Sequence, residues 1–164
     1  MNALMTNGNE AFSRVLIDKA LEFSKWDPLD PQQVQLELNT GSGRADYLLK
    51  DKYGGVLCVV EAKREDLDPY DAKEQARGYA QNVKAPFVIL SNGREHWFWN
   101  FERADQRDAY RIERLPSRND LERVRLKNMH PPQPLGSQII KPDYLRDLKH
   151  DLTLRRGVCF MRGQ

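Results

Sequence analysis

A short apolar segment at residues 56–60 constrains the fold of this chain more than any other feature of its sequence. The segment reads Val-Leu-Cys-Val-Val, and an apolar run without polar alternation is typical of a strand buried on both faces of its sheet. Such a strand needs a layer of packed side chains on each side. The run ends abruptly in Glu61-Ala62-Lys63. The sequence therefore predicts a buried central strand with charged groups at its end.

The segments before this run have the patterns of one helix and two strands. Residues 9–25 are expected to form a helix with Asn9 as its cap. Apolar residues recur along it at helical spacing: Phe12, Leu16, Ala20 and Phe23. Residues 33–39 alternate between polar and apolar side chains, which predicts a half-buried strand. A turn at 40–43 then leads into a second strand at 44–50.

The segments after the run predict a helix and a hairpin. Pro69 is expected to open a helix that continues to about residue 83. Strands are predicted at 86–90 and 96–101, joined by a turn that contains Asn92-Gly93. The order of helix, three-strand meander, helix and hairpin predicts an α/β fold, a three-layer α/β/α sandwich around a central mixed β-sheet.

The domain organisation is expected to have three parts. Residues 1–102 would form the core, and 103–128, with a short helix at 121–127, would be an extension on or near it. Residues 129–164 contain Pro131, Pro132 and Pro134, which predicts a linker followed by a basic tail, with one more helix within 141–154.

The charge of the chain is unevenly distributed. Residues 1–102 have 12 Lys and Arg against 16 Asp and Glu, a balance of −4, whereas residues 103–164 have 14 against 8, a balance of +6. The basic half could lie along a phosphate backbone, but charge alone favours an ordinary solvated surface rich in arginine. The acidic half fits a carboxylate cluster whose charge is offset by a bound cation.

The cysteine and histidine content excludes two classes of site. Cys58 and Cys159 form neither a disulfide framework nor a zinc-binding spacing, and this usage predicts a reducing, cytoplasmic environment. The three histidines, His96, His130 and His150, are scattered, so their spacing suggests neither a zinc site nor a His-Asn-His nuclease. No signal peptide and no membrane span are expected, because the N-terminus lacks a basic region and no apolar run is long enough.

Asp46, Glu61 and Lys63 are the residues whose pattern points to chemistry. Residues two apart on a strand share a face, so Glu61 and Lys63 should project together, and pairing of the two strands should bring Asp46 near Glu61. Two converging carboxylates suit Mg²⁺, and a lysine beside them can position a water molecule or stabilise a transition state. The alternative is a turn-proximal aspartate beside a solvated ion pair.

A further pattern lies in the helix expected after Pro69. Gln75 and Tyr79 are spaced i and i+4, so they should share a helix face. Gly78 is costly in the middle of a helix, which suggests close packing or close backbone approach there.

Together these motifs resemble the nuclease domain at the N-terminus of the motor (R) subunit of type I restriction enzymes, a branch of the PD-(D/E)XK nuclease superfamily. The resemblance covers roughly residues 9–102: a strand with Asp46, a strand ending in Glu61-Ala62-Lys63, and a helix with Gln75 and Tyr79. It implies a restriction-endonuclease-like fold that cleaves duplex DNA with Mg²⁺, for which Mn²⁺ could substitute.

The resemblance also implies roles for single residues. Asp46 and Glu61 would bind the metal, and Lys63 would position the attacking water. Gln75 and Tyr79 would support the site or touch DNA. Glu10 would be a further metal or second-layer contact, or else a glutamate favoured by the helix dipole. Three arginines that flank the site could hold phosphates or be solvated: Arg44, Arg64 and Arg77.

The chain departs from the family pattern in two ways. Ala45 stands where proline often precedes the aspartate, and no P-loop motif is present. We therefore expect a piece of a longer subunit, with a motor domain in cis and methylase and specificity subunits as partners. The competing hypothesis is a catalytically silent module that keeps the fold to bind DNA or to dock against another subunit.

Overall fold

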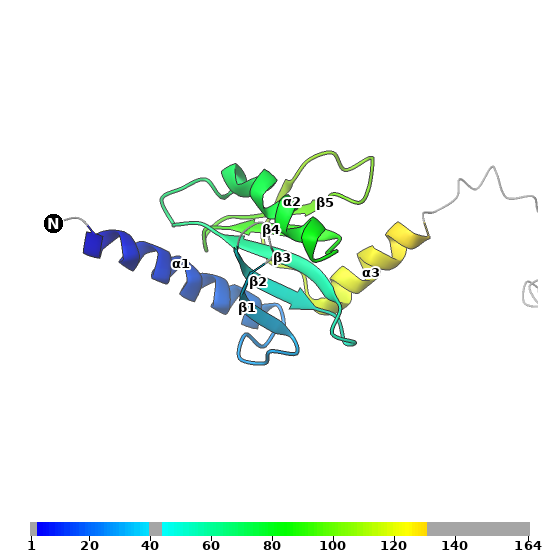
Figure 1. Ribbon diagram of the computed structural model, residues 1–164, viewed down its shortest axis with the longest axis horizontal. Coiled ribbons are helices and arrows are strands. Elements are labelled where there is room, and N and C mark those ends of the chain that lie inside the picture. The colour runs from blue at the N-terminus through cyan, green and yellow to red at the C-terminus, as the bar shows by residue number, and fades with distance from the viewer. Residues whose placement is uncertain (1–2, 40–43, 131–164) are drawn as a thin grey trace, which may run out of the picture. The chain divides into compact units, whose positions relative to one another are not determined.

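A six-stranded mixed sheet with the strand order β1-β2-β3-β4-β5-β6 forms the centre of the part of the chain that the structure describes (Figure 1). The computed structural model describes residues 3–39 and 44–130, with side chains for residues 11–36 and 45–130. The sheet consists of β1 (Val34–Asn39), β2 (Arg44–Lys50), β3 (Val56–Ala62), β4 (Phe87–Ser91), β5 (His96–Asn100) and β6 (Tyr110–Ile112). Adjacent strands are antiparallel except β3 and β4, which are parallel.

The central position of β3 follows from its composition. Cys58 and Val60 pack into the core on one face of the sheet, and Val59 packs into the core on the other. Because β4 runs parallel to β3, a crossover connection must return the chain to the same end of the sheet. That connection is the 3-10 helix η1 (Pro69–Ala72) followed by α2 (Lys73–Asn82).

Helices cover both faces of the sheet, which confirms the predicted three-layer α/β arrangement. On one face, Ile17 and Leu21 of α1 (Ala3–Phe23) and Leu121 of α3 (Arg118–Met129) join the core around Phe87 and Ile89. On the other face, α2 packs its alanines and Tyr79 against the sheet. Figure 1 shows α2 on one side of the strands and α1 and α3 on the other.

The first helix differs from its prediction in extent and in orientation. It begins at Ala3, so Asn9 lies inside it and does not cap it. The residues turned to the core are Ile17 and Leu21, whereas Phe12 is 49% and Phe23 72% exposed. The spacing of the apolar residues predicted a helix correctly but did not select the buried face, because several apolar stripes fit one helical period.

The turn between β4 and β5 anchors α1 against the sheet. Gly93 has a φ of +88°, which favours glycine, and a Cβ there would lie 2.7 Å from the Cβ of Leu16. The amide of Asn92 donates to the backbone oxygens of Glu65 and Leu67 at 3.3 and 3.0 Å. This turn therefore fixes both α1 and the loop that follows β3.

Residues beyond 102 contribute directly to the sheet and its cover. β6, which the sequence patterns did not predict, pairs with β5, and α3 is longer than the expected helix at 121–127. The hydroxyl of Ser24 donates to the oxygen of Leu115 at 2.7 Å, and Trp26 donates to the oxygen of Pro116 at 2.9 Å. The linker and basic tail expected at 129–164, from residue 131 onward, and the helix expected within 141–154 lie outside the described residues.

Candidate functional site

Asp46 lies on β2 and connects three elements through one carboxylate. Its Oδ2 accepts a hydrogen bond from the backbone N–H of Ala62 at the end of β3, at 2.8 Å. Its Oδ1 accepts from Nη2 of Arg14 on α1, at 2.7 Å. The Asp46 side chain is 15% exposed, so it lies at the rim of the protein and not in the core.

Glu61 lies on β3, beside Leu90 of the parallel neighbour β4, and its side chain is only 5% exposed. Its Oε1 accepts from Nζ of Lys63 at 3.3 Å. Its Oε2 is buried and has no hydrogen-bond partner within the described part of the chain. Burial and the charge of Asp46 together raise the pKa of Glu61 to about 7, although Lys63 and Arg14 oppose the shift.

Lys63 follows the last residue of β3 and is held in place by its backbone. Its N–H donates to the backbone oxygen of Ser91 at 2.8 Å, which extends the parallel pairing with β4 by one step. The side chain is 27% exposed and reaches the carboxylate of Glu61. The predicted projection of Glu61 and Lys63 to one side is thus confirmed, as is the approach of Asp46 to Glu61.

Arg14 belongs to this cluster, and the sequence patterns did not reveal it. It lies 32 residues before Asp46, and no local spacing links the two. The cluster therefore consists of two carboxylates and two cations on α1, β2 and the end of β3. Carboxylate oxygens are the ligands that a hard divalent cation prefers, and the unpartnered Oε2 of Glu61 is available to one. Among the described side chains, no group of three or more His, Cys, Asp or Glu could hold a metal ion.

Gln75 and Tyr79 on α2 form a pair, as their spacing predicted. Nε2 of Gln75 donates to the hydroxyl of Tyr79 at 2.6 Å. The Tyr79 ring is buried in the same core cluster as Ala45 and Val59, so this helix face packs on the strands that contain Asp46 and Glu61. Gly78 does not mark close packing as expected, because a Cβ there would meet nothing within 4 Å.

Comparison with known families identifies the chain. A family described as the N-terminus of the type I restriction enzyme R protein matches residues 27–116, which is more than half of the sequence. The chain belongs to this family. The matched segment of this R-protein N-terminal domain includes Asp46, Glu61, Lys63, Gln75 and Tyr79, whereas Arg14 precedes it.

Two solved structures resemble this R-protein N-terminal domain. A fragment assigned to an HsdR subunit of a type I restriction enzyme from Vibrio vulnificus matches with a TM-score of 0.61 and 26% identity, over 73% of this chain and 26% of that one. The type IIG restriction endonuclease BpuSI matches with a TM-score of 0.41 and 23% identity, over 56% of this chain and 11% of that one. This chain thus spans about a quarter of the HsdR chain that it matches. No curated protein matches it.

The remaining predicted residues of the R-protein N-terminal domain lie outside the Asp46 cluster or outside the described side chains. Glu10 is within α1 and Arg44 begins β2, but the side chains of both are outside the described residues. Arg64 pairs with Asp66, through Nε at 3.0 Å and Nη2. Arg77 pairs with Glu74 at 2.6 Å and lies over the ring of Trp99. Within residues 3–39 and 44–130, no helix is long and apolar enough to span a membrane.

Proposed function

We propose that this R-protein N-terminal domain is a Mg²⁺-dependent endonuclease of the PD-(D/E)XK type that hydrolyses phosphodiester bonds of duplex DNA. The observation that carries the proposal is the buried carboxylate of Glu61. One of its oxygens has no hydrogen-bond partner among the described residues, and the negative charge of Asp46 opposes its ionisation. A buried charge that is not compensated is costly, and a divalent cation between the two carboxylates would offset that cost.

Each residue of the cluster would have a separate role in hydrolysis. Asp46 and Glu61 would hold Mg²⁺, or Mn²⁺ in its place, which when bound supplies a water of lowered pKa and offsets charge on the phosphoryl oxygens. Lys63 would orient the attacking water from its position beside Glu61 and stabilise the charge that develops on the phosphate. The water oxygen would form a bond to phosphorus while the bond from phosphorus to one bridging oxygen breaks. The water would lose a proton to solvent, and the leaving oxygen would take a proton from solvent.

The neighbouring elements would support this arrangement. The hydrogen-bonded side chains of Gln75 and Tyr79 on α2 would support the site or contact DNA near the scissile phosphate. Arg44, Arg64 and Arg77 would approach the backbone of the duplex, for which Arg64 and Arg77 would exchange their exposed carboxylate partners for phosphates. Glu10 would add a carboxylate from α1.

The family and the length of the matched structure support a proposal for the partners. We propose a motor domain in cis and methylase and specificity subunits in the same complex, with a cytoplasmic location. A second function, that of a catalytically silent module that binds DNA or docks a subunit, would leave the carboxylate pair without use. The silent-module hypothesis therefore predicts that the chain does not need to bind a metal ion, whereas the nuclease hypothesis predicts that it does.

Metal titration followed by plasmid nicking tests the proposal. Calorimetric titration with Mg²⁺ or Mn²⁺ should show binding to the wild-type chain and a loss of binding in Asp46→Ala. Asp105→Ala is the matched control, because Asp105 is exposed and pairs with Arg103 after β5, at the opposite end of the sheet from Glu61. The wild type should nick supercoiled plasmid only with metal. Equal metal affinity in Asp46→Ala and the wild type would exclude Asp46 as a ligand, and DNA binding without any nicking would favour the silent module.

A further inference from the structure

Asn92 lies in the turn between β4 and β5, and its backbone conformation does not account for its presence there. In the tight hairpin turns that favour Asn-Gly, both central residues have a positive φ. Gly93 has a φ of +88°, but the residues other than glycine with a positive φ in the described part of the chain are Lys25 and Lys84. The side chain of Asn92 is therefore the feature to explain, and the residue is only 5% exposed.

The two ends of the Asn92 amide make different contacts. Its Oδ1 accepts from the backbone N–H groups of Arg94 and Glu95, at 3.0 and 2.8 Å, which closes the turn. Its Nδ2 donates to the backbone oxygens of Glu65 and Leu67, at 3.3 and 3.0 Å. An aspartate would close the turn equally well, because it offers the same acceptor oxygen. Only the amide also holds the loop that follows β3.

The segment that this turn holds begins at Lys63. The Lys63 N–H donates to the backbone oxygen of Ser91 at 2.8 Å, and two residues later the oxygen of Glu65 accepts from Asn92. Arg94 of the same turn also pairs with Glu65, but its side chain is 67% exposed, and exposed ion pairs contribute little to stability. The buried amide of Asn92 is therefore the stronger of the two side-chain links to this segment.

We propose that Asn92 is a positioning residue for Lys63, because its Nδ2 holds the loop that keeps the Lys63 ammonium beside Glu61. The consequence for cleavage rests on the proposed nuclease function. The Lys63 side chain is 27% exposed, and its Nζ lies 3.3 Å from Oε1 of Glu61. A displacement of about 1 Å in a reacting group can reduce a rate by about 100-fold. Asn92 acts on this pair through the backbone of the loop.

Asn92→Asp separates closure of the turn from attachment of the loop, because aspartate keeps the acceptor and loses both donors. Acylation of lysines, followed by mass spectrometry, reports on Lys63 without any cleavage assay. In Asn92→Asp the acylation of Lys63 should become about fivefold faster, as expected for the loss of a hydrogen bond. Acylation of Lys19, which is 70% exposed on α1, should stay as in the wild type. Asn92→Ala removes the same donors without a new charge, and it replaces the aspartate variant should that variant unfold.

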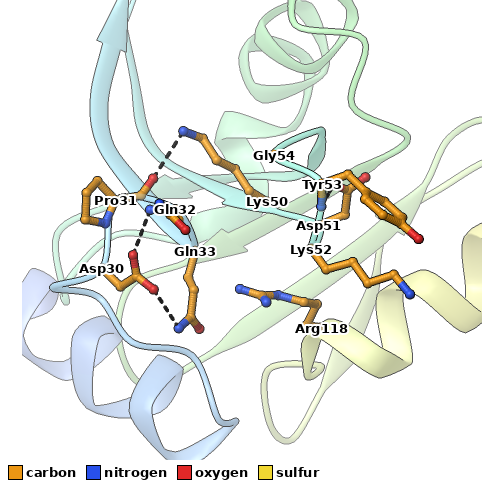
Figure 2. Close-up of a pocket in the computed structure, with 10 residues that line it drawn as sticks. All are labelled: Asp30, Pro31, Gln32, Gln33, Lys50, Asp51, Lys52, Tyr53, Gly54 and Arg118. Atoms are coloured by element: carbon orange, nitrogen blue, oxygen red, sulfur yellow. Dashed lines mark hydrogen bonds between the residues drawn. The ribbon is translucent and has the colours of Figure 1, made fainter.

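The matched control is Gln33→Glu, at a residue of the polar pocket shown in Figure 2. Nε2 of Gln33 donates to Asp30 at 2.9 Å, so this change also replaces an amide donor with a carboxylate oxygen. The backbone of Gln33 pairs with Lys50, which is four residues beyond Asp46 on β2, roughly 13 Å along the strand. Gln33→Glu should destabilise the fold and leave the acylation of Lys63 unchanged, which separates positioning from a general loss of stability.

Single-turnover cleavage of plasmid completes the test. In Asn92→Asp the rate at saturating DNA should fall by about tenfold or more, with the DNA concentration at half-maximal rate unchanged. Wild-type acylation of Lys63 in a folded Asn92 variant would overturn the proposal, and so would faster acylation together with wild-type cleavage. If the wild type does not cleave with any metal, the nuclease function fails, whereas faster acylation of Lys63 in Asn92→Asp still supports the positioning role.

Discussion

Arg14 and Asp46 form an ion pair that joins α1 to the candidate active site, with 2.7 Å between Nη2 and Oδ1. The pair places a fixed positive charge where a metal ion would also be attracted. The same arginine lowers the pKa of Glu61, which burial and Asp46 raise. Arg14 therefore stabilises the carboxylates of this site in the absence of metal.

The first prediction follows from this competition. Arg14→Gln should tighten the binding of Mg²⁺ by up to about tenfold, because a charge-assisted hydrogen bond no longer competes for Asp46. Calorimetric titration measures the change, and Arg123→Gln is the control because Arg123 is exposed on α3. Weaker metal binding in Arg14→Gln would show instead that the arginine holds Asp46 in its binding position.

The second prediction concerns pH. The pKa of Glu61 is raised from its ordinary 4.5 to about 7, so the folded protein binds a proton that the unfolded chain releases between these values. In EDTA the free energy of unfolding should therefore fall as pH rises from about 4.5 to 7, by at most about 3 kcal/mol. Above pH 7 this contribution should stay constant.

Urea denaturation of the wild type and of Glu61→Gln measures this contribution. The variant should equal the wild type near pH 4.5 and be more stable at pH 8. Burial lowers the pKa of His96, so His96 acts in the opposite direction, but it does so in both proteins and cancels in the difference. Parallel stability curves for the two proteins from pH 4.5 to 8 would contradict the shift at Glu61.

The third prediction separates chemistry from folding at Lys63. Lys63→Ala should reduce cleavage by about 100-fold or more, the usual size of a lost proton-transfer or charge-stabilising group. Its circular dichroism and DNA binding should stay close to wild type, because the side chain is at the rim and leaves no core cavity. Lys19→Ala, 70% exposed on α1, is the control for charge. Wild-type cleavage by Lys63→Ala in the full assembly would remove Lys63 from the site.

The fourth prediction tests the helix that contains Gln75 and Tyr79. Tyr79→Phe keeps the buried ring and removes only the hydroxyl that accepts from Gln75, so stability should fall by about 1 kcal/mol or less. We expect cleavage to decrease in Tyr79→Phe and in Gln75→Ala. Gln81→Ala is the control, because Gln81 is exposed on the same helix. Full cleavage by both test variants would make α2 a scaffold and reduce the site to Asp46, Glu61 and Lys63.

The strands and the central residues of the site were predictable because their signals are local. The apolar run at 56–60 has no solvated face, so only a central strand satisfies it. The period of two along β3 places Glu61 and Lys63 on one side, and the short turn after β2 leaves Asp46 beside them. The match between the predicted and observed bounds of β2 has the same local origin.

Elements that depend on distant contacts were not predictable in this way. Tyr110–Ile112 is a strand because β5 offers it an unpaired edge, and its own pattern is weak. Two apolar stripes compete on α1, and the closeness of Gly93 to Leu16 decides which part of the helix approaches the sheet. Local periodicity has no information on either contact.

The sequence by itself determined a mixed sheet with a buried third strand, and it placed two carboxylates and a lysine at the end of that strand. Only the tertiary structure brought Arg14 to Asp46 and buried Glu61 enough to raise its pKa. The physical reason is one of range. Strand periodicity acts over a few residues, whereas electrostatics and burial depend on which distant segments pack together.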